Sequence, residues 1–429
     1  MDDPEFAPPT IDINTQTILL HASNHDLAAL KSFLRQPGNA SVQDPETGYT
    51  PLHAAIAACG PALSLPSSEQ DVGKGQDREG EGEVDIEKAK EVVKELFLSG
   101  AIWNDLDTNN ETPGCMAWRL GRKELYELCV EAGVRAEMLL GLLGGYEPLA
   151  DEDSEDEEIE AQLDGAETQD PVLPAHNGTN GHTDEPMEEE GEKKDVNSED
   201  YLKSDLKFED DKLLDADANG VMMAWETDIM RRSVDLLLPE NQSGKRILNI
   251  GFGMGIVDRM FRDTKPLSHH IIEAHPAVLA KLAEEGSDFG KAWEESAPEG
   301  GKYLIHKGKW QDIAPKLLEE GEMFDAIYFD TFGEDYSQLK MFFTEYVVGL
   351  LDPEGKFGFF NGLGADRKVC YDVYCRVVEL DLCDAGMDVE WADVPVEGLG
   401  EEGEGEWKGI RRRYWTLDKY QLPICSFMG

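Results

Sequence analysis

The sequence predicts a doubly wound, mostly parallel α/β sheet that ends in an antiparallel hairpin and follows a small all-α repeat domain. Three observations lead to this prediction. Short apolar runs alternate with helix-like stretches over the second half of the 429 residues, and a glycine-rich loop follows the first of these runs. In the first third of the chain, two segments that contain Thr-Pro resemble each other. The chain is long enough for at least two domains.

The N-terminal part, 1–140, carries the two similar segments. "TGYTPLHAAIAACG" (47–60) contains the pattern T-P-L-H-x-A, and 110–134 repeats it imperfectly. Thr and Pro favour a tight turn into a helix, and the small alanine that follows lets paired helices pack closely. These features resemble the ankyrin repeat, so we expect two to three degenerate repeats with an acidic insertion at about 61–83.

A run of acidic residues separates the two halves of the chain. Residues 146–197 are rich in Asp and Glu and poor in aromatic and β-branched side chains, so we predict a disordered linker that buries too little apolar surface to fold. The whole chain has 89 acidic and 39 basic residues, which gives a net charge of −50. Phosphate backbones repel such a surface, so we expect a basic protein partner and no direct nucleic-acid binding. Simple solubility is the alternative explanation of the charge.

Cysteine usage and the N-terminus bear on the compartment. The seven cysteines form no C-x-x-C pair and are odd in number, so the sequence predicts neither a zinc cluster nor a complete disulfide framework. The N-terminus lacks a basic stretch before an apolar core, and no window approaches the roughly 18 apolar residues of a membrane span. We therefore expect a protein of the cytoplasm, with the nucleus as a further location, and no membrane partner or metal ion.

The part of the chain after the linker, 198–429, is predicted to form the α/β sheet. Its short apolar runs are separated by helix-like stretches, the pattern of parallel strands joined by crossover helices. A glycine-rich acidic loop joins the last two runs and is unsuited to a crossover helix, so we expect an antiparallel hairpin at the sheet edge. The predicted strands are 246–250, 269–273, 302–306, 324–330, 356–360, 388–394 and 410–417.

The loop after the first strand contains Gly251, Gly253 and Gly255 and leads into a helix. Bare backbone there lets a nucleotide-type ligand pass close to the carboxyl ends of the strands. The dinucleotide pattern G-x-G-x-x-G would need glycine where this chain has Ile256. Glu273, at the end of the second strand, can accept both hydroxyls of a ribose, although an acid there is also compatible with a solvated turn. S-adenosylmethionine fits these features, because it has an adenosine diol and no pyrophosphate.

Several motifs in 200–429 resemble one enzyme family in their order and spacing. The motifs are "VMMAWETDIM", "NIGFGMGIVD", "EAHP", "KGKWQDIAP" and "FDAIYFDTF". They resemble guanidinoacetate N-methyltransferase and its fungal relatives, the arginine δ-N-methyltransferases (type IV protein arginine methyltransferases). The ankyrin-like repeats favour the fungal protein-modifying branch. The resemblance implies transfer of a methyl group from S-adenosylmethionine to the δ-nitrogen of an arginine in a protein of the large ribosomal subunit.

The resemblance also implies which residues contact the cofactor. The glycine loop is expected around the methionine part, and Trp310 with Gln311 beside the adenine, where glutamine replaces the family's acid. Tyr201 and Met230 match a lid over the cofactor, and Asp330 matches the acid at the end of the fourth strand. The expected cofactor-binding residues are Tyr201, Met230, Phe252, Gly253, Met254, Gly255, Ile256, Val257, Glu273, Ala274, His275, Trp310, Gln311 and Asp330.

The chemistry of a guanidinium leads to the catalytic candidates. A guanidinium is planar, has a pKa above about 12 and is a poor nucleophile until it loses a proton or its conjugation is broken. Two carboxylates can each accept two N–H bonds along its edge and can remove the proton. Glu226, in "AWETD", and Asp330, in "YFDTF", are the predicted pair. Asp330 is predicted to accept the proton and Glu226 to orient the substrate, although the two roles can be exchanged.

Three hypotheses for the function are open on the sequence. The first is a protein-arginine methyltransferase whose ankyrin-like repeats dock the protein substrate. The second is a methyltransferase for a small guanidino metabolite, and the third is a non-catalytic ankyrin adaptor, against which Glu226 and Asp330 weigh. The loop 359–367 is expected either to close the substrate pocket or to be a simple strand-to-helix turn. The arginines of 411–415 are expected on both faces of a strand.

Overall fold

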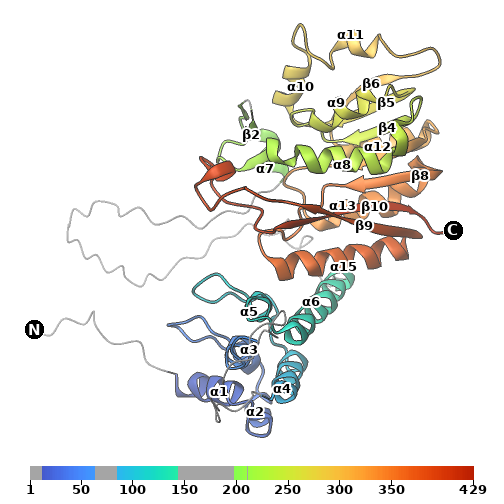
Figure 1. The fold of residues 1–429 in the computed structure, drawn as a ribbon. Helices are drawn as coiled ribbons and strands as arrows, with labels where there is room; N and C mark the ends of the chain where they lie inside the picture. The colour runs from blue at the N-terminus through green and yellow to red at the C-terminus, as the bar shows by residue number, and fades with distance from the viewer. Residues whose placement is uncertain (1–11, 63–84, 144–197, 210) are drawn as a thin grey trace, which may run out of the picture.

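The computed structural model describes residues 12–62, 85–143, 198–209 and 211–429. The predicted linker and the predicted insertion, apart from residues 61 and 62, lie outside these ranges. The described chain forms an N-terminal helical domain and a C-terminal α/β domain, stacked one on the other (Figure 1). Among the described helices, none combines the length and the hydropathy needed to cross a membrane.

The helical domain consists of helix pairs that stack against one another. The predicted Thr-Pro steps start two of the helices: the Thr50 and Thr112 side chains accept hydrogen bonds from the backbone N–H groups of His53 and Cys115. His53 donates through Nε2 to the carbonyl of Glu111, 3.0 Å away, which ties one pair to the next. The assignment of the pairs to the ankyrin class stays a prediction. The helices are α1 (Ile13–Ser23), α2 (Leu27–Phe33), α3 (Pro51–Ala57), α4 (Ile86–Leu98), α5 (Pro113–Arg119) and α6 (Lys123–Leu143).

A seven-stranded sheet forms the centre of the α/β domain, in the order β6-β5-β4-β7-β8-β10-β9. The first five of these strands are parallel, whereas β10 runs antiparallel to both of its neighbours. This topology confirms the predicted mostly parallel sheet with an antiparallel hairpin. The strands are β4 (Arg246–Ile250), β5 (Ser268–Glu273), β6 (Tyr303–Lys307), β7 (Phe324–Phe329), β8 (Leu351–Phe359), β9 (Met387–Pro395) and β10 (Lys419–Phe427).

The prediction of a strand at 410–417 is wrong, because the hairpin partner of β9 is the later segment β10. The backbone of the earlier segment bonds to two separate loops instead of a neighbouring strand. The N–H of Arg411 donates to the carbonyl of Ala218, and the N–H of Thr416 donates to the carbonyl of Ala365. The segment is therefore an irregular connection rather than an edge strand of the sheet.

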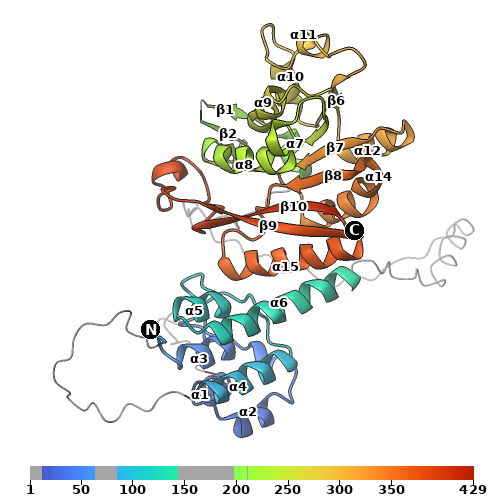
Figure 2. The same ribbon diagram turned by 45° about the vertical axis from the view of Figure 1, so that its right-hand side comes forward.

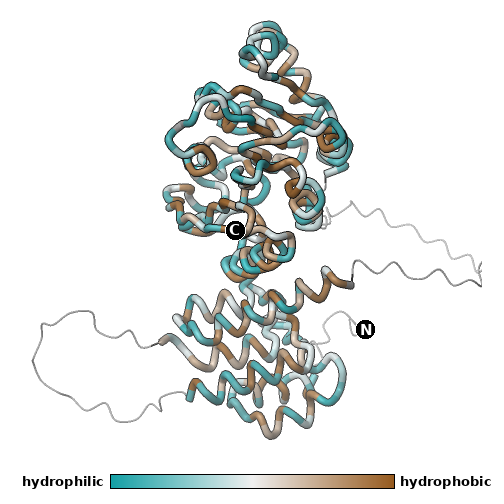
Figure 3. The backbone as a smooth tube through the Cα atoms, turned by 90° about the vertical axis from the view of Figure 1, so that its right-hand side faces the viewer, coloured by the Kyte–Doolittle hydropathy of each residue, from teal (hydrophilic) through white to brown (hydrophobic). Residues whose placement is uncertain are grey.

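Helices cover both faces of the sheet, as a doubly wound fold requires (Figure 2). Neighbouring residues of β4 point to opposite faces: Ile247 packs with α8 and α9, and Leu248 packs with α12 and the helical turns before β8. Hydrophobic residues gather in the strands and along one side of many helices (Figure 3). The helices are α7 (Ser198–Lys203), α8 (Thr227–Leu237), α9 (Ile256–Asp263), α10 (Pro276–Leu282), α11 (Lys291–Glu294), α12 (Trp310–Glu319), α13 (Tyr336–Met341), α14 (Val348–Leu350) and α15 (Lys368–Asp384).

A small antiparallel sheet precedes the large one and lies over its glycine loop. Its strands are not among the predicted ones. Its last strand leads into the short 3-10 turn Ala224–Glu226, and the sulfur of Met222 accepts a hydrogen bond from the backbone N–H of Met254, 3.2 Å away. The strands are β1 (Lys207–Phe208), β2 (Lys212–Leu214) and β3 (Gly220–Met223).

The two domains share one hydrophobic core, which forms where α6 and α15 lie side by side (Figures 1 and 2). Val369 and Val373 of α15 are fully buried among the side chains of the helical domain. A Cβ atom at Gly114 would come within 2.6 Å of Val369, and one at Gly133 within 2.6 Å of Val373. The helices thus approach too closely for larger residues, and the domains are fixed relative to each other.

Candidate functional site

Two cavities adjoin at the carboxyl ends of the parallel strands. We call them the glycine-loop cavity, lined by Gly251, Gly253, Glu273 and other residues, and the two-acid cavity, lined by Glu226 and other residues. They have about 620 and 1700 Å³ of empty space, in each case including space open to solvent. The residues that line both cavities are Val221, Asp330, Thr331, Phe332 and Glu334.

The glycine loop is held against the end of β7. Gly251 has a φ of +89°, and a Cβ atom there would lie 1.8 Å from the backbone carbonyl oxygen of Asp330. The side-chain N–H₂ group of Asn249 donates to the Gly251 carbonyl at 2.7 Å and to the buried Asp258 carboxylate at 2.9 Å. Only glycine fits the first position of the loop, and this close approach places Asp330 beside it.

Glu273 ends β5 in the wall of the glycine-loop cavity, as predicted. One of its oxygens accepts hydrogen bonds from the backbone N–H groups of Phe252 at 2.9 Å and Gly253 at 3.4 Å, and the other from that of His275 at 2.6 Å. Burial raises the pKa of Glu273, and these hydrogen bonds oppose the shift. Because an ionised carboxylate has about four acceptor positions, Glu273 can organise the loop and still receive a hydroxyl group.

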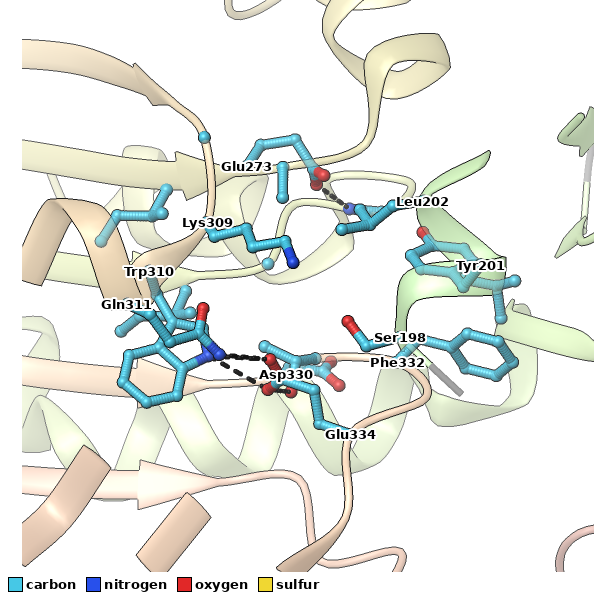
Figure 4. A pocket seen from close by; sticks show the side chains of 18 of the residues that line it. Ser198, Tyr201, Leu202, Glu273, Lys309, Trp310, Gln311, Asp330, Phe332 and Glu334 are labelled. Carbon is cyan, nitrogen blue, oxygen red and sulfur yellow. Dashed lines mark hydrogen bonds between the residues drawn. The ribbon is translucent and has the colours of Figure 1, made fainter. Parts of the chain in front are cut away.

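Trp310 and Gln311 lie in the opposite wall, and both point toward Glu334 (Figure 4). Trp310 Nε1 and Gln311 Nε2 lie 3.0 and 2.9 Å from Glu334 Oε1, and Thr331 donates to the other oxygen at 2.7 Å. The side-chain oxygen of Gln311 is buried and has no hydrogen-bond partner among the described residues. An unpaired acceptor in this wall suits a ligand with an amino group, such as adenine.

Glu334 lines both cavities but is not among the predicted site residues. Its carboxylate accepts a hydrogen bond from the side chain of Gln311, and it follows Asp330 by only four residues, in "DTFGED". An acid in the turn after a strand is a common surface feature, so it carried no signal by itself. Its hydrogen bonds to Trp310 and Gln311 come from the tertiary structure.

Tyr201 closes one end of the glycine-loop cavity, as the predicted lid does (Figure 4). Its ring packs against the rings of His275 and Phe332, with centroids 4.7 and 5.0 Å apart. His275 caps α10 by accepting the backbone N–H of Ala277 at Nδ1, and its Nε2 donates to the carbonyl of Tyr201 at 3.0 Å. His275 therefore positions the lid rather than lining the cavity.

The structure places half of the expected cofactor residues in the lining of the cavity and the other half outside it. Met230 is fully buried in the core under α8, because it lies on the inward face of that helix. Phe252 packs its ring on Phe289, with centroids 5.4 Å apart, and its backbone N–H donates to Glu273. The cavity is lined by Tyr201, Gly253, Glu273, Ala274, Trp310, Gln311 and Asp330, but not by Met230, Phe252, Met254, Gly255, Ile256, Val257 or His275.

The two-acid cavity brings together Glu226 and Asp330, the predicted catalytic pair. Glu226 is 4% exposed and is fixed at both oxygens. Oε1 accepts the hydroxyl of Tyr414 at 2.6 Å, and Oε2 accepts the backbone N–H of Met223 at 3.1 Å. Asp330 follows β7, and its backbone N–H donates to the carbonyl of Ile250 at 2.9 Å. The side chain of Glu226 and the backbone of Asp330 are thus both held in place by hydrogen bonds.

Burial places the titration of both acids near neutral pH. Burial raises the pKa of Glu226 to about 8, and the negative charge of Asp330 adds to the shift. Burial likewise raises the pKa of Asp330 to about 7, with a smaller contribution from the charge of Asp258. A cation that enters the cavity relieves both effects and lowers both pKa values. Such acids can accept a proton at physiological pH, and they favour a cationic guest.

The remaining wall comes from two segments after the fifth predicted strand. Phe360, Gly362 and Leu363 line the two-acid cavity, which supports the expectation that the loop 359–367 closes a pocket. Arg411, Arg412 and Tyr414 line it as well, and sequence reasoning assigned them to a strand. Arg411 pairs with Asp217 at 3.7 Å and Arg412 with Asp366 at 3.3 Å.

Comparisons with known proteins agree with this geometry. The sequence profile of the family described as "Guanidinoacetate N-methyltransferase" matches residues 190–368. A protein of Gibberella zeae named "Protein arginine N-methyltransferase 2" is 59% identical over 406 residues, which cover 94% of this chain and 90% of that protein. Proteins with the same name from Neurospora crassa and Emericella nidulans are 54% and 51% identical, and the alignments cover 99% and 97% of this chain and 97% and 98% of those proteins.

Proposed function

The chain belongs to the family of fungal proteins named protein arginine N-methyltransferase 2, and on this premise we propose that it methylates an arginine of a basic protein. S-adenosylmethionine is the methyl donor. The acceptor is the δ-nitrogen, it receives one methyl group, and the substrate is a protein of the large ribosomal subunit. The name of the relatives supports arginine as the target, whereas the δ-nitrogen and the ribosomal substrate rest on the resemblance of motifs. The N-terminal helical domain, with its ankyrin-like repeats, docks this substrate.

The glycine-loop cavity has the groups that this cofactor needs. Gly251 and Gly253 leave the backbone bare, Glu273 keeps an acceptor position for a ribose hydroxyl, and Gln311 offers an unpaired acceptor to the amino group of adenine. S-adenosylmethionine supplies an electrophilic methyl group when it is bound. The cavity holds it next to Asp330, which also lines the two-acid cavity.

The observation that carries the proposal is the presence of Glu226 and Asp330 in one cavity that shares a wall with the glycine-loop cavity. Glu226, held at both oxygens, orients the planar guanidinium through its N–H edge. Asp330, at the boundary between the cavities, accepts the proton that the guanidinium must lose. Holding the nitrogen in line with the methyl group supplies the rest of the rate enhancement.

A small guanidino acid is the second candidate substrate. The profile match to guanidinoacetate N-methyltransferase favours it. Arg411 and Arg412 also favour it, because they line the two-acid cavity and their guanidinium groups can bind the carboxylate of such a substrate. Both arginines already form ion pairs with carboxylates, Asp217 and Asp366, which neutralise much of their positive charge within the protein. This weakens the second candidate relative to an arginine side chain.

The test is incubation of the purified full chain with labelled S-adenosylmethionine and the proteins of dissociated large ribosomal subunits. Mass spectrometry of the labelled peptide separates δ-methylarginine from ω-methylarginine. We expect label on the δ-nitrogen of one arginine, and no label with a Glu226→Gln, Asp330→Asn double variant. Label on an ω-nitrogen contradicts the δ assignment. Label that appears only on added guanidinoacetate supports the second candidate.

A further inference from the structure

We propose that a groove between the two domains binds the polypeptide segment next to the target arginine, an inference that rests on the proposed function. The interdomain groove has one wall from the helical domain, made by the loop before α5 and by α5 itself, and one wall from the α/β domain. Its lining residues are Asn109, Asn110, Glu111, Cys115, Trp118 and Arg119 on one side, and Asp366, Arg367, Lys368, Thr416, Leu417 and Asp418 on the other.

The interdomain groove begins where the two-acid cavity ends. Arg412 lines the cavity and Asp366 lines the groove, and their ion pair, 3.3 Å long, crosses the boundary. Thr416, in the groove wall, donates from its hydroxyl to the carbonyl of Asp366 at 3.1 Å, and this contact joins the two segments that form both hollows. A substrate arginine whose guanidinium reaches Glu226 leaves its backbone at the mouth of the cavity. The adjoining residues of that substrate then lie in the groove.

The shape of the groove is fixed, because the two domains share a core. Gly133 of α6 lies against Val373 of α15, and the hydroxyl of Tyr126 donates to the carboxylate of Asp372 at 2.5 Å. A rigid groove loses less conformational entropy on binding than one that forms between mobile domains. The helical domain is thus placed to select the substrate by shape and not only to raise its local concentration.

Trp118 is the anchor of the groove. Its side chain is 46% exposed, an uncommon state for the largest apolar side chain, and aromatic residues of this kind dominate the energetics of interfaces. The ring is held by Tyr126, with centroids 5.1 Å apart, and by the Lys368 ammonium 4.6 Å from its centroid. It therefore presents one surface in one orientation.

The occupant follows from the chemistry of the lining. Arg119 pairs with Glu111 at 2.7 Å, and Lys368 pairs with Asp372 at 3.0 Å. Arg367 pairs with Asp366 at 3.4 Å, so the basic side chains of the lining all have acidic partners within the chain. What the groove offers is the indole of Trp118 and hydrogen-bonding side chains such as those of Asn109 and Asn110. These groups fit an extended segment that places an apolar side chain on Trp118 and its backbone amides against the asparagines.

The experiment compares Trp118→Ala with Leu98→Ala, a matched loss of an exposed apolar side chain outside the groove. The substrate is the protein mixture of dissociated large ribosomal subunits, and initial rates of methyl transfer are measured over a range of concentrations. We expect Trp118→Ala to raise the KM about tenfold, as truncation of an interface aromatic does, and to leave kcat unchanged. Binding of S-adenosylhomocysteine, measured by calorimetry, should be equal in both variants and the wild type.

Each outcome decides between the two proposals. Equal KM values for Trp118→Ala and the wild type overturn the groove while leaving the proposed function intact. A wild type that labels no protein in the mixture overturns both. A fall in kcat with no change in KM also overturns the groove, because it places Trp118 in the reaction rather than in docking.

Cysteine protection gives a second readout that does not depend on activity. Cys115 is half-buried in the groove wall, and Cys383 is exposed on α15, outside the groove lining. The protein that becomes labelled in the first experiment is purified and added in excess, and alkylation by N-ethylmaleimide is followed by mass spectrometry. We expect slower alkylation of Cys115 and an unchanged rate at Cys383. Unchanged rates at both cysteines in the saturated complex contradict the groove.

Discussion

The two adjoining cavities differ in how the chain builds them. The glycine-loop cavity is made largely by the carboxyl ends of β4, β5, β6 and β7 and the turns that follow them, so many of its features appear as short motifs in the sequence. The two-acid cavity gathers 219–226, 329–339, 360–363 and 411–414, which come from widely separated elements. A binding loop can therefore be recognised from the local sequence, whereas an acceptor pocket depends on packing. Asp330 is where the two meet.

Amide substitutions of the two acids should have the largest effects and should distinguish the roles of the two cavities. We expect Glu226→Gln and Asp330→Asn each to lower kcat by about 10²- to 10⁴-fold, the usual contribution of an acid–base group. Glu226 lines only the two-acid cavity, so its variant should keep wild-type affinity for S-adenosylhomocysteine, whereas Asp330→Asn should change that affinity too. Steady-state kinetics and calorimetry measure the two effects. Equal changes in the affinity for S-adenosylhomocysteine in both variants would argue against separate roles for the two cavities.

Gly251→Ala should damage the glycine-loop cavity first. The new Cβ would lie 1.8 Å from the Asp330 carbonyl oxygen, and the loop must move to avoid it. We expect binding of S-adenosylhomocysteine to weaken by about 100-fold, because the added strain falls on the binding loop. The control is Gly244→Ala, at a similar φ of +77° but with no atom within 4 Å. It carries only the left-handed backbone cost of about 1–2 kcal/mol, seen as lower thermal stability.

The pH profile tests the electrostatics of the two-acid cavity. The pKa values of Glu226 and Asp330 are raised, to about 8 and about 7, so both groups hold a proton at lower pH. Only the carboxylate forms can accept a proton or attract a guanidinium, so kcat/KM should rise with pH through this range and level off above it. A profile that is flat from about pH 6 to about pH 9 would contradict the assignment.

Tyr414→Phe should produce the smallest effect. The hydroxyl of Tyr414 donates to Glu226 and favours its charged form, which lowers the pKa of that acid. Its loss should move the rising limb of the kcat/KM profile to higher pH by about one unit, so that the rate falls about tenfold at pH 7 and recovers at high pH. Tyr303→Phe is the control, because its hydroxyl donates to the carbonyl of Pro266 outside both cavities. A loss that does not recover would mean that Tyr414 shapes the wall instead.

Much of the fold could be predicted from the sequence, because strands and turns depend on residues that are close together in the chain. The apolar run 246–250 coincides with β4, and the Thr-Pro steps start helices at Pro51 and Pro113. The failure at 410–417 has a physical cause. Its arginine and aromatic residues suit a strand, but its backbone finds partners in two loops and leaves the sheet to 419–427.

Residue types and their near neighbours along the chain were enough to predict the alternation of strands and helices, the bare loop at Gly251 and the acids Glu226, Glu273 and Asp330. The tertiary structure decided which side chains meet. It joined Glu226 to Tyr414 across 188 positions, as only packing of the whole domain can do. It also buried Met230 instead of leaving it in the cavity, because which face of a helix turns inward depends on what packs against it.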